Sequence, residues 1–97
     1  MQITDLRPGI TKNVTLSNAY QKLSDLMGIS SDGVFFTVIT YNAEIAFADT
    51  QPSVNGHPLA VGDILNWSSK YMVNTAWVRN GTASSNSVLI VTPLYAN

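Results

Sequence analysis

The sequence contains no cysteine and little charge, and each shortage excludes a class of function. Without cysteine the chain has neither a disulfide framework nor thiolate chemistry. Charged residues make up 11% of the chain, well below the usual ~25%. The formal net charge of −1 leaves no basic stripe to neutralise phosphates, so we expect no nucleic-acid partner.

Long apolar runs are also missing. No stretch approaches the ~18 apolar residues that a membrane span requires, and the N-terminus lacks the basic-then-apolar pattern of a signal peptide. We therefore expect no membrane partner. Small uncharged polar groups supply the surface instead, since Ser, Thr and Asn together number 28.

Hydrophobic residues nevertheless reach 45% of the chain, so the low hydrophobicity and high net charge of a disordered chain are absent. The length suits one domain over residues 1–97 with a single core. Residues 1–9 are expected to form an N-terminal arm, which ends at the turn signal Pro8-Gly9.

Short runs rich in β-branched and aromatic residues, separated by turn signals, predict an all-β fold. The pattern indicates a small β-sandwich or jelly-roll-like barrel of about seven short strands. The runs are residues 1–6, 12–16, 34–41, 43–48, 63–67, 72–79 and 87–93. Residues 49–62, dense in Pro, Gly, Asn and Ser, are expected to cross irregularly from one sheet to another.

Two hairpins and one helix are predicted within this pattern. The run 43–48 should return along 34–41, and the run 87–93 along 72–79 after a polar connection that carries Asn80-Gly81.

The helix is expected over residues 18–27, with Ser17 as its N-cap and Gly28 at its end. Within it, Tyr20, Leu23 and Met27 would form one apolar stripe.

No catalytic, cofactor or metal site is predicted. His57 is the single histidine, and one histidine without cysteine cannot build the usual zinc site. Asp49 and Asp63 bracket the 49–62 connection as a candidate acid–base pair, but both stand where an aspartate commonly bonds nearby backbone. Neither a Gly-x-Ser-x-Gly elbow nor a glycine-rich phosphate loop is present. We therefore expect a protein that is not an enzyme and binds no cofactor.

Residues 34–39 and 88–91 carry apolar side chains on both strand faces. A sandwich buries only inner faces, and soluble monomers rarely leave a large apolar patch exposed. The sequence therefore predicts a contact surface for another chain, with Val34, Phe36, Val38, Val88 and Ile90 as its residues. The alternative is that residues 49–62 and the N-terminal arm cover these faces.

Aromatic residues favour a second function, carbohydrate binding or host adhesion. Trp67, Tyr71 and Trp77 lie close together in sequence, and exposed aromatic rings on a β-sandwich stack on sugars. Trp67 and Tyr71 are the candidate glycan contacts. Trp77, between Ala76 and Val78, is expected to pack inside the protein.

Several stretches carry a resemblance over nearly the whole chain. They are residues 13–17 before Tyr20 and Leu23, 43–48 followed by 49–52, 58–59 before 61–63, 76–79, and 89–92. This order of features resembles the small β-sandwich virion structural proteins of tailed bacteriophages, the accessory proteins of heads and tails. The resemblance implies capsid decoration or a tail role, in the virion after synthesis in the bacterial host cytoplasm. It also implies a homo-oligomer, often a trimer, bound to the phage major capsid protein or a tail protein.

Overall fold

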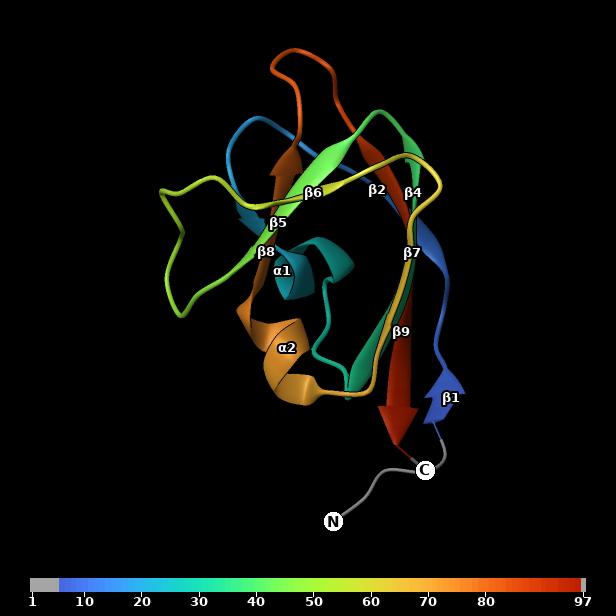
Figure 1. The fold of residues 1–97 in the computed structure, drawn as a ribbon. Coiled ribbons are helices and arrows are strands. Elements are labelled where there is room, and N and C mark those ends of the chain that lie inside the picture. Colours follow the sequence, from blue (N-terminus) through green and yellow to red (C-terminus); the bar gives the residue numbers. More distant parts are fainter. Residues whose placement is uncertain (1–5, 97) are drawn as a thin grey trace.

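A computed structural model describes residues 6–96, which form two antiparallel sheets and two short helices (Figure 1). Sheet A consists of β1 (Leu6–Pro8), β2 (Lys12–Thr15), β9 (Val88–Ala96), β4 (Gly33–Thr40) and β7 (Ile64–Trp67). Sheet B consists, in spatial order, of β3 (Gln21–Lys22), β8 (Ala76–Asn80), β5 (Ala43–Phe47) and β6 (His57–Leu59). The helices are α1 (Leu23–Met27) and α2 (Lys70–Thr75). The predicted small all-β sandwich with a short helix is confirmed.

Strand β9 lies in the middle of sheet A, as its two apolar faces predict. It pairs with β4 along one side, and β1 and β2 pair one after the other along its second side. Leu89 and Val91 face inward and are fully buried, whereas Ile90 faces outward. The predicted arm contributes β1, opposite the end of β9; residues 1–5 of that arm lie outside the described residues.

The hydrophobic core lies between the two sheets. Alternate residues of β2, β4, β5, β8 and β9 supply most of it, because successive strand side chains point to opposite faces. Phe36 is the largest side chain that is fully buried. The core members are Val14, Leu16, Leu23, Met27, Val34, Phe36, Val38, Ala43, Ile45, Leu59, Val73, Ala76, Val78, Leu89 and Val91.

Both predicted hairpins are wrong, because the chain changes sheet at each turn. β4 belongs to sheet A and β5 to sheet B, and Tyr41 makes the corner with a left-handed φ of 55°. β8 and β9 are likewise in different sheets, joined by residues 81–87. Strand-forming composition and a turn signal locate strand ends but do not determine which strands pair.

The predicted helix over residues 18–27 is too long. Lys22 is extended, with ψ 130°, and α1 begins only after it. Ser17 therefore caps no helix; its hydroxyl bonds the Ala19 carbonyl and the Gln21 side chain. The predicted end is confirmed, since Gly28 caps α1 at a φ of 74°, a conformation that favours glycine.

Helix α2 replaces the first half of the strand predicted over residues 72–79. Ser69 is its N-cap and accepts a hydrogen bond from the Met72 backbone N–H at 3.2 Å. Residues 76–80 continue as β8.

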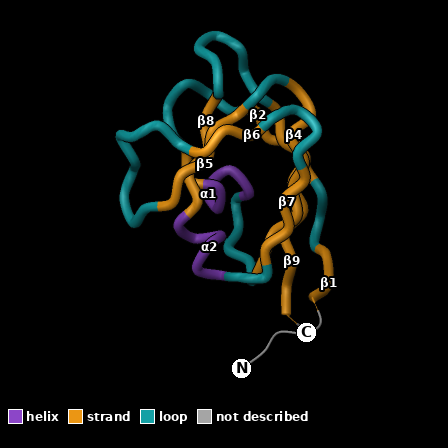
Figure 2. Tube along the Cα trace, in the orientation of Figure 1, coloured by secondary structure: helices purple, strands orange, loops and turns teal. Residues whose placement is uncertain are grey.

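The connection after β5 is long and leaves the sandwich on the side of sheet B (Figure 2). It was predicted to be irregular throughout residues 49–62, but His57–Leu59 pair with β5 as β6. The chain then crosses to sheet A, where Asp63 precedes β7.

Candidate interaction face

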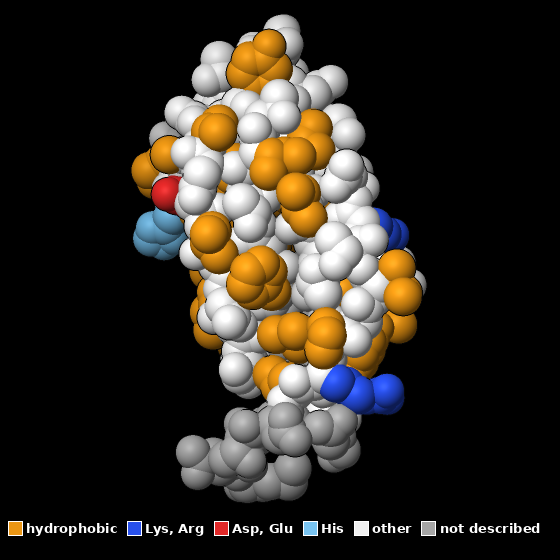
Figure 3. All heavy atoms as spheres, turned by 90° about the vertical axis from the view of Figure 1, so that its right-hand side faces the viewer, with side chains coloured by type: hydrophobic (Ala, Val, Ile, Leu, Met, Phe, Trp, Pro, Cys, Tyr) orange, Lys and Arg blue, Asp and Glu red, His pale blue; other side chains and the backbone are white. Residues whose placement is uncertain are grey.

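The outer face of sheet A carries no charged side chain among residues 6–96. Strand register gives it the apolar residues Leu6, Pro8, Phe35, Ile64, Val88, Ile90 and Leu94, and the polar residues Asn13, Thr15, Thr37, Thr40, Asn66 and Thr92. Ile39, at the register shift between Val38 and Thr40, adds a further exposed apolar side chain. Phe35 is 41% exposed and Ile64 63% exposed. In the view of this side in Figure 3, apolar side chains spread over the face and the visible charged ones lie at its margins.

The outer face of sheet B is different, because the chain covers it. The connection between β5 and β6 is held over it by three hydrogen bonds. The Trp77 indole N–H donates to the Ala48 carbonyl at 3.0 Å. The Tyr20 hydroxyl donates to the Val54 carbonyl at 2.9 Å, and the Gln51 amide donates to the Tyr20 carbonyl at 2.8 Å. Ala46, which faces outward from β5 opposite Trp77, is consequently buried.

A charged pair also anchors the connection between β5 and β6, which forms the cover over sheet B. Glu44 and Arg79 lie opposite each other on β5 and β8, and the Glu44 carboxylate also accepts the Gly56 backbone N–H at 3.2 Å. Burial raises the pKa of Glu44, but the hydrogen bonds from Gly56, Arg79 and Tyr20 outweigh it, so the pKa of this carboxyl lies below its ordinary value. Burial raises the pKa of the Tyr20 phenol, and Glu44 beside it adds to that rise while Arg79 opposes it.

The predicted contact residues divide between the two faces of sheet A. Val34, Phe36 and Val38 are fully buried in the core, so the prediction that they form a contact surface is corrected. Packing against sheet B decides which face of β4 points inward. Val88 and Ile90 lie on the outer face and are half-buried. Phe35 and Ile39 belong to the run 34–39 on which the prediction was based, whereas the apolar residues Leu6, Pro8, Ile64 and Leu94 of this face were not predicted.

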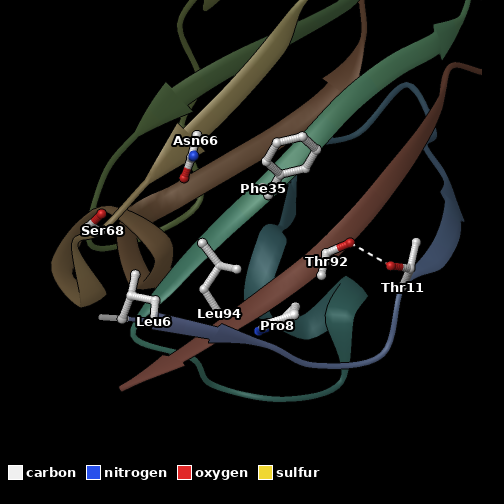
Figure 4. Close-up of a pocket in the computed structure, with 8 residues that line it drawn as sticks. All are labelled: Leu6, Pro8, Thr11, Phe35, Asn66, Ser68, Thr92 and Leu94. Carbon is white, nitrogen blue, oxygen red and sulfur yellow. Dashed lines mark hydrogen bonds between the residues drawn. The ribbon is translucent and has the colours of Figure 1, made fainter. Parts of the chain in front are cut away.

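A shallow hollow of about 570 Å³ marks this outer face (Figure 4). Its lining consists of Leu6, Pro8, Thr11, Phe35, Asn66, Ser68, Thr92 and Leu94. Phe35 is flanked in register by Asn66 on β7 and Thr92 on β9. The Thr92 and Thr11 hydroxyl oxygens are 2.7 Å apart and share a hydrogen bond. The hollow therefore combines an aromatic ring and aliphatic groups with neutral hydrogen-bonding groups.

The two aromatic residues predicted to contact glycans lie in different environments. Trp67 points inward, where its ring meets Phe36 edge-on at 5.4 Å and Phe47 at 5.5 Å between centroids. Tyr71 is 72% exposed, on α2. Trp67 is therefore part of the packing at the border of the core, whereas Tyr71 is exposed, and a glycan contact there stays a prediction.

Two of the residues considered for acid–base chemistry, Asp63 and His57, belong to a turn and to a strand of the fold. The Asp63 carboxylate accepts the Ala60 backbone N–H at 2.8 Å, which closes the turn before β7. His57 is an exposed residue of β6, opposite Ile45. Within residues 6–96, no three His, Cys, Asp or Glu side chains gather in a way that would hold a metal ion.

Comparisons with protein-family models, with curated proteins and with solved structures found no match to this chain. In the part of the chain that the structure describes, neither helix has the length or the apolar character needed to cross a membrane.

Proposed function

We propose that this protein is a non-enzymatic structural subunit that assembles through the outer face of sheet A. One observation carries the proposal. Over residues 6–96 this face has no charged side chain and exposes large apolar ones, whereas the chain covers the outer face of sheet B with its own connection. An identical face on a second copy would meet it without burying an unpaired charge, which is a costly event in protein interfaces.

The energetics favour association through this face. Burial of a few hundred Å² of apolar surface at ~25 cal/mol per Å² contributes roughly 5–10 kcal/mol before the costs of association. Soluble monomers rarely leave such a patch in contact with water. We therefore propose a symmetric homo-oligomer, with a trimer as the state that the resemblance to phage virion proteins favours.

The setting we propose is the virion of a tailed bacteriophage, where the protein would bind the major capsid protein or a tail protein. Support for this setting comes from the layout of strands and turns along the sequence. The uncharged face is compatible with it, because a subunit that docks by apolar contact needs no catalytic group and no cofactor.

The first test is the mass in solution, measured by light scattering on a sizing column across a dilution series. We expect a whole multiple of the 10.5-kDa chain. Ile90→Asp, which places a charge at the centre of sheet A, should reduce the mass to that of the monomer. Val54→Asp, an equal change on the exposed connection over sheet B, should leave the mass unchanged. A folded Ile90→Asp variant with the wild-type mass would show that another surface makes the contact.

The virion setting has its own test. Purified wild-type protein should sediment with heads or tails of the phage whose genome encodes it, and Ile90→Asp should not. If the wild-type protein forms a stable oligomer but sediments with neither part, the virion setting is rejected. Assembly through the outer face of sheet A, which we call the assembly face, is then retained.

A second candidate function is the binding of a neutral glycan, and the hollow beside Phe35 favours it. An exposed aromatic ring can stack on a sugar ring, while Asn66, Ser68 and Thr92 offer neutral donors and acceptors for hydroxyl groups. This candidate predicts a monomer that gives a signal on a glycan array, with the signal lost in Phe35→Ala. A Phe35→Ala variant that keeps the signal would reject it.

A further inference from the structure

A separate apolar cleft lies on the opposite side of β9 from the assembly face. Its volume is about 310 Å³, and its lining includes Ile10, Lys12, Met27, Ile29, Val91 and Tyr95. Val91 and its register partner Lys12 project toward the inside of the sandwich, whereas Ile90 projects outward. A ligand in the cleft and a partner on the assembly face would therefore occupy different surfaces.

The cleft arises from the unequal length of the two sheets. β9 runs through nine residues, and its C-terminal end extends beyond the strands of sheet B (Figure 1). Met27 of α1 and Ile29 after it line the cleft together with Val91 and Tyr95 of β9. The wall next to β1 is tightly packed. The Gly9 N–H donates to the Pro93 carbonyl at 2.7 Å, and a Cβ on Gly9 would lie 2.6 Å from the Tyr95 ring. At the position of Gly9, this wall therefore has no room for a larger residue.

Two aliphatic side chains remain in water at the cleft. Ile10 is 85% exposed and Ile29 is 46% exposed. They come from opposite sides, Ile10 from the segment between β1 and β2 and Ile29 from the segment after α1. A hydrocarbon chain between them would bury both, together with the apolar floor at Met27 and Val91.

Among residues 6–96, Lys12 is the one charged residue in the lining. Its Nζ atom lies over the C-terminal end of α1, 3.7 Å from the position that a Cβ on Gly28 would take. Within residues 6–96 the Lys12 ammonium makes neither an ion pair nor a hydrogen bond. Asp25, which lines the adjacent hollow with Ile29, does not form an ion pair with it. An apolar cleft with one unpaired cation is complementary to an apolar chain that ends in an anion.

We propose that this cleft binds an aliphatic monocarboxylate, with its hydrocarbon chain between Ile10 and Ile29 and its carboxylate on the Lys12 ammonium. The class follows from the lining, in which the described residues offer one cation and no further charged group. A sugar or a nucleotide would find too few polar partners here. This inference does not depend on the assembly proposal, since the two surfaces lie on opposite sides of β9.

The test is a titration of the ¹³C-methyl-labelled, full-length protein with octanoate, followed by NMR. We expect the methyl signals of Ile10, Met27 and Ile29 to shift, while those of Ile39 and Ile64 on the assembly face stay in place. Octanol, which has the same chain without the charge, should bind about tenfold more weakly, because it lacks the charge-assisted contact.

Two variants complete the test. Lys12→Met keeps the length of the side chain and should weaken octanoate about tenfold while leaving octanol unchanged. Ile29→Ser should weaken both ligands. Equal shifts at Ile64 and Ile29 would mean adventitious adsorption to apolar surface and would overturn the proposal, as would octanoate affinity that Lys12→Met leaves intact. On the sizing column, the same samples should have the wild-type mass in the presence of octanoate. Binding of the ligand and assembly of the protein are therefore tested separately.

Discussion

The Arg79 guanidinium donates two hydrogen bonds to a single oxygen of Glu44, from Nε at 3.1 Å and from Nη2 at 2.9 Å. The guanidinium carbon also lies 4.2 Å from the centre of the Tyr20 ring, a cation–π distance. Since the same carboxylate oxygen accepts the Gly56 N–H, one half-buried pair joins two strands of sheet B to the connection that covers them. The cover over sheet B therefore has a defined anchor.

Replacement of this anchor should loosen the cover. Glu44→Gln preserves the shape of the side chain but removes its charge, so we expect a loss of about 1–3 kcal/mol in the free energy of unfolding. Urea unfolding followed by tryptophan fluorescence, to which Trp67 and Trp77 both contribute, measures it. Asp49→Asn removes an exposed carboxylate and serves as the control, with an expected change within ±0.5 kcal/mol. An equal effect of the two substitutions would show that the pair does not stabilise the cover.

The Glu44–Arg79 pair should also make the free energy of unfolding depend on pH in the acidic range. The folded-state pKa of Glu44 lies below the ordinary value near 4.5, so in the acidic range the unfolded chain binds more protons than the folded one. The stabilisation is complete above the unfolded pKa and is lost as the pH falls through the lower, folded pKa. Wild type should therefore lose more stability than Glu44→Gln between pH 7 and about pH 3. Parallel stability profiles for the two proteins would contradict this assignment.

Gly56 sits where the cover touches β5, and a side chain has no room there. A Cβ at this position would lie 2.5 Å from the Ile45 carbonyl oxygen and 2.7 Å from the Tyr20 hydroxyl. We expect Gly56→Ala to cost about 1–3 kcal/mol, as overpacking does. Ala60→Ser, a small change at an exposed position of the next turn, is the control. Thermal unfolding with the same midpoint for Gly56→Ala and wild type would mean that the cover shifts without cost.

Strand composition predicted the architecture but not the faces of β4. Residues 34–39 are largely apolar on both faces of the strand. Alternation assigns residues to two faces but does not show which face is buried. The one local signal was Thr37, which interrupts the set of Phe35 and Ile39, whereas Val34, Phe36 and Val38 form an uninterrupted set. The uninterrupted set is the buried one. On β9, Thr92 marks the outer face in the same way, opposite Phe35.

Contacts between distant segments explain what the sequence left unpredicted. Asn80 precedes Gly81 as in a hairpin turn, yet its amide is buried and donates to Asn18 and Asn86 at 2.9 Å each. It also accepts the Ser87 N–H, and so closes a connection between the sheets. Tyr20 has helical spacing to Leu23, but its hydroxyl is bonded to Val54, 34 residues away. Neither role has a signature in neighbouring residues.

Phe35 and Phe36 are neighbours on β4 and provide the sharpest test of the face assignment. Phe36→Ala removes a fully buried ring, which typically costs 3–5 kcal/mol, and should lower stability at every protein concentration. Phe35→Ala removes an outward ring beside the hollow and should cost an isolated chain about 1 kcal/mol or less.

The dependence of the unfolding midpoint on protein concentration separates the roles of Phe35 and Phe36. An oligomer is stabilised by mass action, so the unfolding midpoint of the wild type should rise with protein concentration. Phe36→Ala should keep that rise from a lower starting point, whereas Phe35→Ala should abolish it. Calorimetry over a hundredfold range of concentration gives both slopes. A wild-type midpoint independent of concentration would contradict assembly through this face, because no stabilising partner would then be lost on dilution.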